Sequence, residues 1–111
     1  MFIADCFLED PKYEEPFNSH WRAQIGTLKE YVDAAHAAGF CQEKIEDLSG
    51  PAARFWTLSI SLMHSEAKSR TLDAKSTARI EASRRMHALV RDGLASGGLR
   101  HMLLDFSLNA Q

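Results

Sequence analysis

The sequence predicts an α/β domain in which a small sheet is combined with long helices. Short apolar runs of strand length, helical apolar periodicity between them, and a helix that separates the first two runs all favour this class. A helix between two strands is typical of a right-handed parallel crossover. The expected elements of this single domain, residues 1–111, are a strand at 1–8, a helix at 27–39, a strand at 40–48, helices over 51–96 and a strand at 98–108.

The first expected strand is the apolar run FIADCFL, which ends at the acidic, proline-containing stretch EDPKYEEP. A short apolar run bounded by turn residues is typical of a strand covered on both faces. Residues 9–26 show no helical periodicity, so a long loop is expected there. Loops of that length inside a domain are usually functional.

The helix over 27–39 has the clearest signals. Thr27 and Glu30 form a T-x-x-E capping box, and Gly39 is a natural helix end. Its expected apolar stripe consists of Leu28, Tyr31, Val32 and Ala35. The following FCQEKIED predicts the strand at 40–48, closed by polar turn residues.

The helices over 51–96 are predicted from apolar spacing. Pro51 suits a first helical turn, and glycines after residue 92 end the second helix. The arginines of this second helix indicate a solvated face. The apolar positions are Phe55, Trp56, Ile60 and Met63, then Ile80, Met86, Leu89, Val90 and Leu94. The partial alternation of LRHMLLDFSL predicts the last strand.

Composition excludes several classes of function. A formal net charge of −2 gives no general attraction to nucleic acid or to an anionic membrane. No apolar run reaches the roughly 18 residues of a membrane span, and acids follow the first apolar run directly, so a cytoplasmic protein is expected. The histidines and the cysteines Cys6 and Cys41 lack metal-ligand spacing, so no metal site is expected and both cysteines are expected to be reduced thiols.

In the order of its expected elements and in several short sequence stretches, the chain resembles the C-terminal half of a class I S-adenosylmethionine-dependent methyltransferase of the small-molecule, natural-product type. FIADCFLED resembles the fifth strand of that family, TLKEYVDAAHAAGF the helix after it, CQEKIEDLSG the sixth strand, and PAARFW the start of a substrate-cap segment. The resemblance implies a partial Rossmann-like methyltransferase sheet with a helical cap, in which GLRHMLLDFSL is the antiparallel seventh strand between the other two. It also implies that Cys6 and Cys41 lie about 10 Å apart, too far for a disulfide.

The family binds its cofactor with a glycine-rich turn that opens a helix, which lets the backbone approach the ligand closely. The glycine-rich stretch GLASGG follows a helix instead. We therefore expect S-adenosylmethionine to be bound mainly by a partner chain that carries the N-terminal half, so that the first strand is completed by outside backbone. A homodimer that exchanges strands is the other possible partner.

Candidate site residues lie where ligands bind in open α/β sheets, beyond the carboxyl ends of parallel strands. His20 is the candidate general base, and Trp21 could stack on a sulfonium or an apolar substrate. Arg22 could meet an anionic substrate group. The other expected substrate-binding residues are Asp5, Phe7, Gln24, Phe55 and Trp56.

Each candidate also has a purely structural interpretation. His20 could be an exposed loop histidine, and Trp21 a core anchor that fixes the loop. Phe55 and Trp56 could pack the cap helix on its neighbours. Positioning alone can lower a methyl-transfer barrier by several kcal/mol, so such a site needs no catalytic residue.

Two functions are consistent with the sequence. The first is the substrate-binding subunit of a heteromeric S-adenosylmethionine-dependent methyltransferase that acts on a small specialised metabolite and is inactive alone. The second is a non-catalytic, methyltransferase-like interaction or regulatory protein that pairs with a complete enzyme or with itself.

Overall fold

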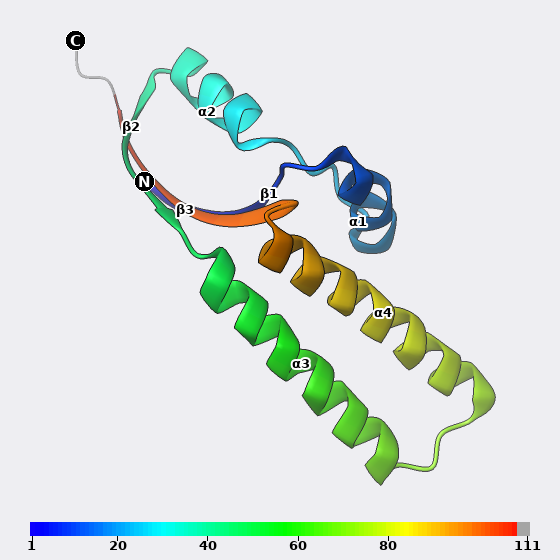
Figure 1. The fold of residues 1–111 in the computed structure, drawn as a ribbon. Helices are drawn as coiled ribbons and strands as arrows, with labels where there is room; N and C mark the ends of the chain where they lie inside the picture. Colours follow the sequence, from blue (N-terminus) through cyan, green and yellow to red (C-terminus); the bar gives the residue numbers. More distant parts are fainter. Residues whose placement is uncertain (109–111) are drawn as a thin grey trace.

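The computed structural model describes residues 1–108 and shows a small sheet with helices at both of its faces. Along the chain, strand β1 (Phe2–Leu8) is followed by a short 3-10 helix (Pro11–Tyr13) and helix α1 (Glu14–Trp21). Helix α2 (Leu28–Ala37), strand β2 (Phe40–Asp47), helices α3 (Ser49–Ser69) and α4 (Ala74–Ser96), and strand β3 (Leu99–Leu108) complete the order. Figure 1 shows α2 beside the sheet, while α3 and α4 extend away from it as a long hairpin.

The three strands are ordered β1-β3-β2, and β3 is antiparallel to both neighbours. The last strand therefore lies between the first two and runs in the opposite direction, as the resemblance implied. Because β1 and β2 run the same way, their carboxyl ends, at Leu8 and Asp47, meet at one edge of the sheet. Both α1 and α3 leave the sheet at that edge, so it is where a ligand site is expected.

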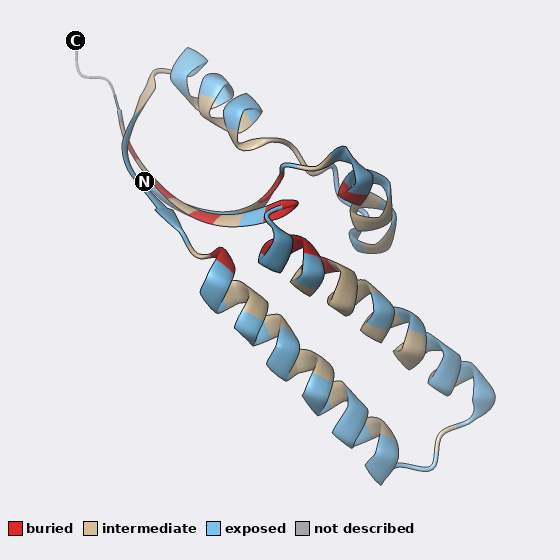
Figure 2. Cartoon of the chain, in the orientation of Figure 1, coloured by how far each residue is buried: buried red, intermediate tan, exposed pale blue. Residues whose placement is uncertain are grey.

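Alternating residues of the sheet contribute to two separate cores. Phe7 and Met102 face α2, where they pack with Leu104 and Phe106 against the predicted apolar stripe of that helix. The other core combines alternate strand residues with the ends of α1 and α4, and its buried members are Leu8, Tyr13, Val90, Leu94 and Leu99. Figure 2 shows buried residues along β3, in the part of α4 next to the sheet, at the end of β1 and beside α1.

Helix α2 begins as its sequence predicts. The Thr27 side chain accepts a hydrogen bond from the Glu30 backbone N–H at 3.1 Å, and the Glu30 carboxylate accepts one from the Thr27 N–H at 3.4 Å. Gly39 follows the helix with a φ of 94°, a left-handed conformation that favours glycine. Together these signals set both ends of α2.

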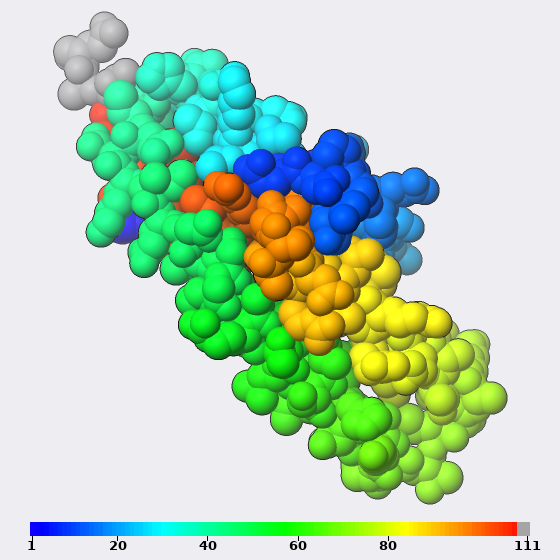
Figure 3. All heavy atoms as spheres, in the orientation of Figure 1, coloured from blue at the N-terminus to red at the C-terminus, as the bar shows by residue number. Residues whose placement is uncertain are grey.

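The hairpin of α3 and α4 gives the molecule its length, with extents of 62 × 24 × 22 Å, and Figure 3 shows this elongated outline. Helix α3 begins at Ser49, two residues before Pro51. The Ser49 N–H donates to Asp47 at 2.8 Å, and the Ser49 hydroxyl accepts from the His101 N–H at 3.0 Å. These bonds tie the root of the hairpin to β3.

The expectation of a loop over residues 9–26 was wrong, since the 3-10 helix and α1 occupy most of it. Asp10 caps the 3-10 helix by accepting from the Lys12 N–H at 3.0 Å. Pro11 and Pro16 both lie in the first turns of their helices, where an N–H has no intrahelical partner and a proline costs little. Helical periodicity is weak because α1 has only 8 residues.

The first strand is not covered on both faces along its whole length. Phe7 and Leu8 are buried, but Phe2 is 72% exposed, because β1 is an edge strand and the helices pack only near its carboxyl end. Cys6 and Cys41 lie on the outer strands and do not form a disulfide, as predicted.

Candidate functional site

A cavity of about 560 Å³ lies between the carboxyl half of β1, the end of α1 and the roots of α3 and α4. This volume is within the range of small-molecule sites, roughly 300–1,000 Å³. Of the predicted residues, the cavity brings together Asp5, Trp21, Phe55 and Trp56. Its remaining walls are Ala4, Cys6, Phe17, Leu48, Pro51, Ala52, Val90, Leu94 and His101.

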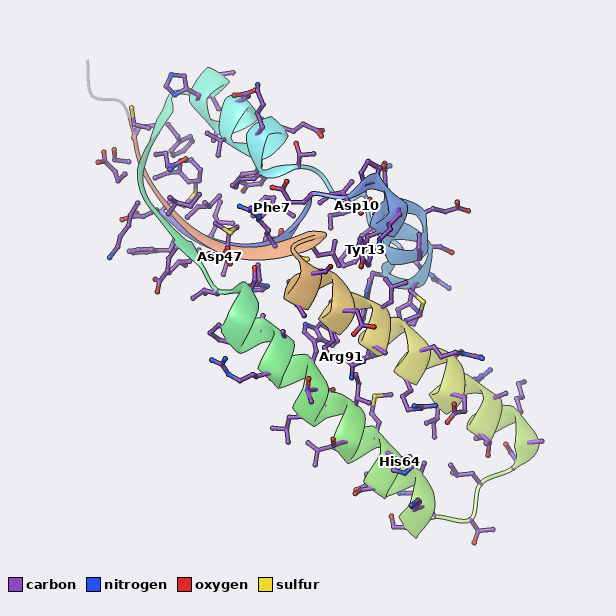
Figure 4. All side chains as sticks on the ribbon, in the orientation of Figure 1. Phe7, Asp10, Tyr13, Asp47, His64 and Arg91 are labelled. Atoms are coloured by element: carbon purple, nitrogen blue, oxygen red, sulfur yellow. The ribbon has the colours of Figure 1, made fainter. Side chains whose placement is uncertain are left out.

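Tyr13 holds α1, and with it one wall of the cavity, against the rest of the molecule. Its side chain is 8% exposed and lies beside Gly93 and Gly98, where a Cβ at residue 98 would be 2.2 Å from the tyrosine ring. The Gly98 carbonyl accepts from the N–H groups of Glu9 and Asp10 at 3.0 and 2.9 Å. Figure 4 shows Tyr13 between α1 and the sheet end of α4. The glycines thus make room for the residue that positions α1.

Aromatic side chains from three helices meet beside the cavity. The ring centroids of Trp21 and Trp56 are 5.8 Å apart, and His87 lies 5.5 Å from Trp21 and 4.8 Å from Trp56. His87 Nδ1 donates to the Ser83 carbonyl at 2.7 Å, which fixes the orientation of the imidazole. The edge-to-face geometry of these rings stabilises the contact between α1 and the hairpin.

The polar groups of the cavity lie at its β1 side. One carboxylate oxygen of Asp5 accepts from the Cys6 N–H at 2.7 Å. Burial, and secondarily the charge of Asp5, raise the pKa of Cys6 to about 11, so this thiol is protonated at neutral pH. His101 is directly opposite Cys6 across the β1–β3 pair, and both side chains face the cavity.

Gln24 and Phe7 belong to a second, neighbouring cavity of about 410 Å³ between β1 and α2. Phe7 is only 3% exposed and contacts Tyr31 edge to face at 5.4 Å, so it is mainly a core residue of the α2 side. Asp5, Cys6 and Phe17 line both cavities, which therefore share a wall at β1.

His20 and Arg22 are not brought into the first cavity. The centroid of the His20 ring lies 4.6 Å from that of Trp21 and 6.4 Å from that of His87. Arg22 ends α1 with a φ of 50° and is exposed. Both were placed from their position in a presumed loop, and neither is among the residues that line the cavity.

Sequence reasoning missed Phe17, His87 and His101. His101 shares the strand alternation of Leu99 and Leu103, which places it on the cavity face of β3 and could have identified it. Phe17 required α1 to be recognised as a helix. His87 had no local signal, because its aromatic neighbours come from the approach of α1 and α3 to α4.

The three-stranded sheet, with a helical hairpin inserted before its last strand, has the arrangement of part of a methyltransferase fold. In comparison with solved structures, the chain is similar to a geranyl diphosphate methyltransferase in complex with SAM, with a TM-score of 0.65 and 14% sequence identity. The match covers 98% of this chain and 38% of that enzyme, so the chain spans well under half of its length. No family model and no curated protein matches the sequence.

Membrane-spanning segments were also sought in the helices. Within residues 1–108, none of the helices combines the length and the apolarity that a bilayer crossing requires.

Proposed function

We propose that this chain is the substrate-binding subunit of a heteromeric S-adenosylmethionine-dependent methyltransferase that acts on a small specialised metabolite. The cavity at the carboxyl ends of β1 and β2 holds the substrate, and a partner chain supplies the cofactor loop. The cytoplasmic location expected from the sequence remains part of this proposal.

The cavity of about 560 Å³ is the observation that carries the proposal. It lies at the edge of the sheet where α/β folds bind ligands. Its walls are mainly apolar and aromatic with few polar groups, a composition typical of sites for small organic molecules. Residues as far apart as Asp5 and Trp56 contribute to it, so it is a product of the fold and not of one surface loop.

The edge of β1 supports the need for a second piece of sheet. Phe2 and Ala4 are exposed on this strand, and outside backbone could pair along it until Leu8, where Thr27 already forms a parallel bridge. An exposed apolar edge strand favours pairing with another strand. The similar enzyme is much longer than this chain and was determined with SAM, which is consistent with cofactor binding by the remaining strands.

The test is to measure S-adenosylmethionine binding calorimetrically for the chain alone and after co-expression with the product of a neighbouring gene that carries a glycine-rich strand–turn–helix. We expect binding only by the co-purified complex, together with methyl transfer to a small-molecule acceptor. Tight binding by the chain alone would contradict the divided site. A strand-exchanged homodimer would be recognised by its mass in light scattering.

An exposed apolar stripe favours a second candidate, the non-catalytic interaction protein. Phe55, Leu58 and Leu62 lie along one face of α3 and are 64%, 58% and 57% exposed. Leu58 and Leu62 lie outside the cavity, so charged substitutions at these two residues test the stripe separately from the cavity. If L58E/L62E abolishes association with a complete methyltransferase while the cavity of the partner suffices for activity, this second function is correct and the first is not.

A further inference from the structure

The exposed face of α3 carries apolar side chains that the cavity uses only in part. Phe55, Leu58 and Leu62 follow one another at spacings of three and four residues, so they form one stripe along the helix, the α3 stripe. All three side chains are more than half exposed. Phe55 also lines the cavity, whereas Leu58 and Leu62 do not. A continuous exposed stripe of this kind indicates a surface that binds another molecule.

The α3 stripe points away from α4. Trp56, Ile60 and Met63 are partly buried, and Trp56 contacts His87 of α4, so these residues form the inner face of the hairpin. The helical period places the stripe on the other side of α3. Figure 1 shows α3 at the outer side of the hairpin, with α4 next to it on the inner side. The stripe is therefore open to a helix from another molecule.

Opposite charges lie at the two ends of the α3 stripe. Toward the sheet, residues 43–47 of β2 contain three acidic side chains and one lysine. Toward the far end of the hairpin, residues 68–75 contain three basic side chains and one aspartate. Two copies of α3 that pack in the same direction would bring like charges together at both ends. Two copies that pack in opposite directions bring unlike charges together at both ends, so the charges favour a second, antiparallel copy of this chain.

The position of the stripe within α3 suits such a pair. The helix has 21 residues, and Leu58 lies next to its midpoint. An antiparallel pair centred at Leu58 sets Phe55 against Leu62 of the second copy and overlaps the two helices along their whole length. The same alignment brings Glu46, which precedes the helix, near Lys68 at the end of the second helix.

Glu46 and Lys68 are both available for this contact. Glu46 is opposite Leu103 of β3, which alternates along the strand with Leu99 of the hairpin-side core, so Glu46 lies on the hairpin face of the sheet. Both side chains are exposed, and neither forms an ion pair within residues 1–108. Because two-fold symmetry repeats every contact, this pair of charges would occur twice in the dimer.

We propose that this chain forms a two-fold symmetric dimer in which the α3 stripes of two copies pack in antiparallel orientation. This inference goes beyond the proposed function, because it concerns a different surface and leaves the edge of β1 open to another chain. Leu62 of the second copy would lie beside Phe55, a wall of the cavity, so the dimer also extends that wall. An anionic membrane would instead be attracted at one end of the stripe and repelled at the other.

Sedimentation velocity over a series of concentrations, from roughly 5 to 500 µM, tests the dimer, because an interface of one helix face belongs to the weaker class. We expect the unaltered chain to pass from monomer to dimer within this range. L58E/L62E should raise the dimer dissociation constant roughly ten-fold or more. A34E/A82E adds the same two charges at exposed positions of α2 and α4 and should leave the dimer unchanged. Circular dichroism checks that both variants fold.

Reversal of the two end charges tests the orientation. Glu46→Lys and Lys68→Glu should each weaken the dimer roughly five-fold, since each contact occurs twice, and the two substitutions combined should restore it. In a parallel dimer the combined variant would gain nothing over the single variants.

Cross-linking gives a second test of orientation. Under mild oxidation, Leu58→Cys should form a disulfide between copies, because residue 58 lies at the two-fold axis. Ser65→Cys, exposed on the same side of α3, would lie about 20 Å from its copy at 1.5 Å per residue and should not cross-link. The unaltered chain controls for the native cysteines.

A chain that stays monomeric at every concentration would overturn the inference, even if it bound anionic vesicles. So would a dimer that survives L58E/L62E, as a strand-exchanged dimer paired through β1 would, or equal cross-linking of Leu58→Cys and Ser65→Cys. None of these measurements contains S-adenosylmethionine or a partner with a glycine-rich loop. Their failure is therefore distinguishable from failure of the cofactor-binding test above.

Discussion

The substitution Gly98→Ala tests whether Tyr13 positions the α1 wall of the cavity. A Cβ at this residue would lie 2.2 Å from Cε2 and 2.8 Å from Cδ2 of Tyr13, closer than real contacts allow. The Tyr13 ring is buried, and Gly93 lies beside both this ring and Leu99. The ring can therefore give way only by moving together with α1.

The cost can be worked out from two opposing effects. Overpacking of a buried site costs about 1–3 kcal/mol, and the lower entropy of alanine in the unfolded chain returns about 0.5 kcal/mol. The free energy of unfolding should thus fall by about 1.5 kcal/mol. With an unfolding entropy of roughly 2 cal/mol/K per residue, this lowers the Tm of a chain of 111 residues by about 6 °C.

The assay combines thermal unfolding, followed by circular dichroism, with tryptophan emission, because Trp21 lies on α1 and should become more exposed. Gly50→Ala is the matched control. It lies in the first turn of α3, and the nearest atom to its added Cβ is 3.9 Å away. We expect this control to keep or raise the Tm.

The double variant Tyr13→Leu/Gly98→Ala should lose less stability than the sum of the two single variants, since the clashing ring is gone. If Gly98→Ala leaves both the Tm and the emission unchanged, Tyr13 does not hold α1 and the account of the cavity wall is wrong.

Three further results are expected. Hydrogen bonds from Ser49 are the chief cause of the lowered pKa of Asp47, so this carboxylate stabilises the fold above its unfolded pKa of about 3.9 and loses the effect as the pH falls toward the folded pKa. The unaltered chain should therefore have a higher Tm than Asp47→Asn at pH 7, and this difference should shrink below pH 4. A Tm difference that does not change with pH would contradict the argument. In a Cys41→Ser background, Cys6 should react with iodoacetamide at pH 8 roughly 100-fold more slowly than an ordinary thiol, because its pKa is about 11 in place of 9.0; equal rates in native and urea-unfolded chains would refute the burial argument. Thr27→Ala removes the capping box of α2 and should cost about 1 kcal/mol in urea unfolding, whereas Thr57→Ala on the exposed side of α3 should cost much less.

Local signals were sufficient for much of the fold. Thr27, Glu30 and Gly39 set the limits of α2 because each satisfies a backbone requirement at a helix end. The sheet order followed from the family resemblance and not from the residues of β3, since alternation alone does not say which strands are neighbours. Helix α1 was missed because a short helix that begins among prolines and acids carries little periodicity.

The site was less accessible to sequence reasoning for a different reason. Asp5 was found because it lies toward the carboxyl end of the first strand, and Trp56 because PAARFW resembles the start of a substrate-cap segment. His87 and Phe17 depend on how two helices far apart in the chain approach each other, and Tyr13 with Gly93 and Gly98 determines that approach. Side chains that are brought together by such long-range packing cannot be recognised from the sequence around each of them.

The hairpin of α3 and α4 is inserted between β2 and β3, two strands that are hydrogen-bonded neighbours. Its root is fastened at Ser49 and Gly98, while the connection at residues 70–73 lies at the far end from the sheet. Adding or removing equal numbers of turns in both helices would therefore leave the strand register intact. The hairpin can therefore vary in length independently of the sheet, while the cavity at its base keeps its shape.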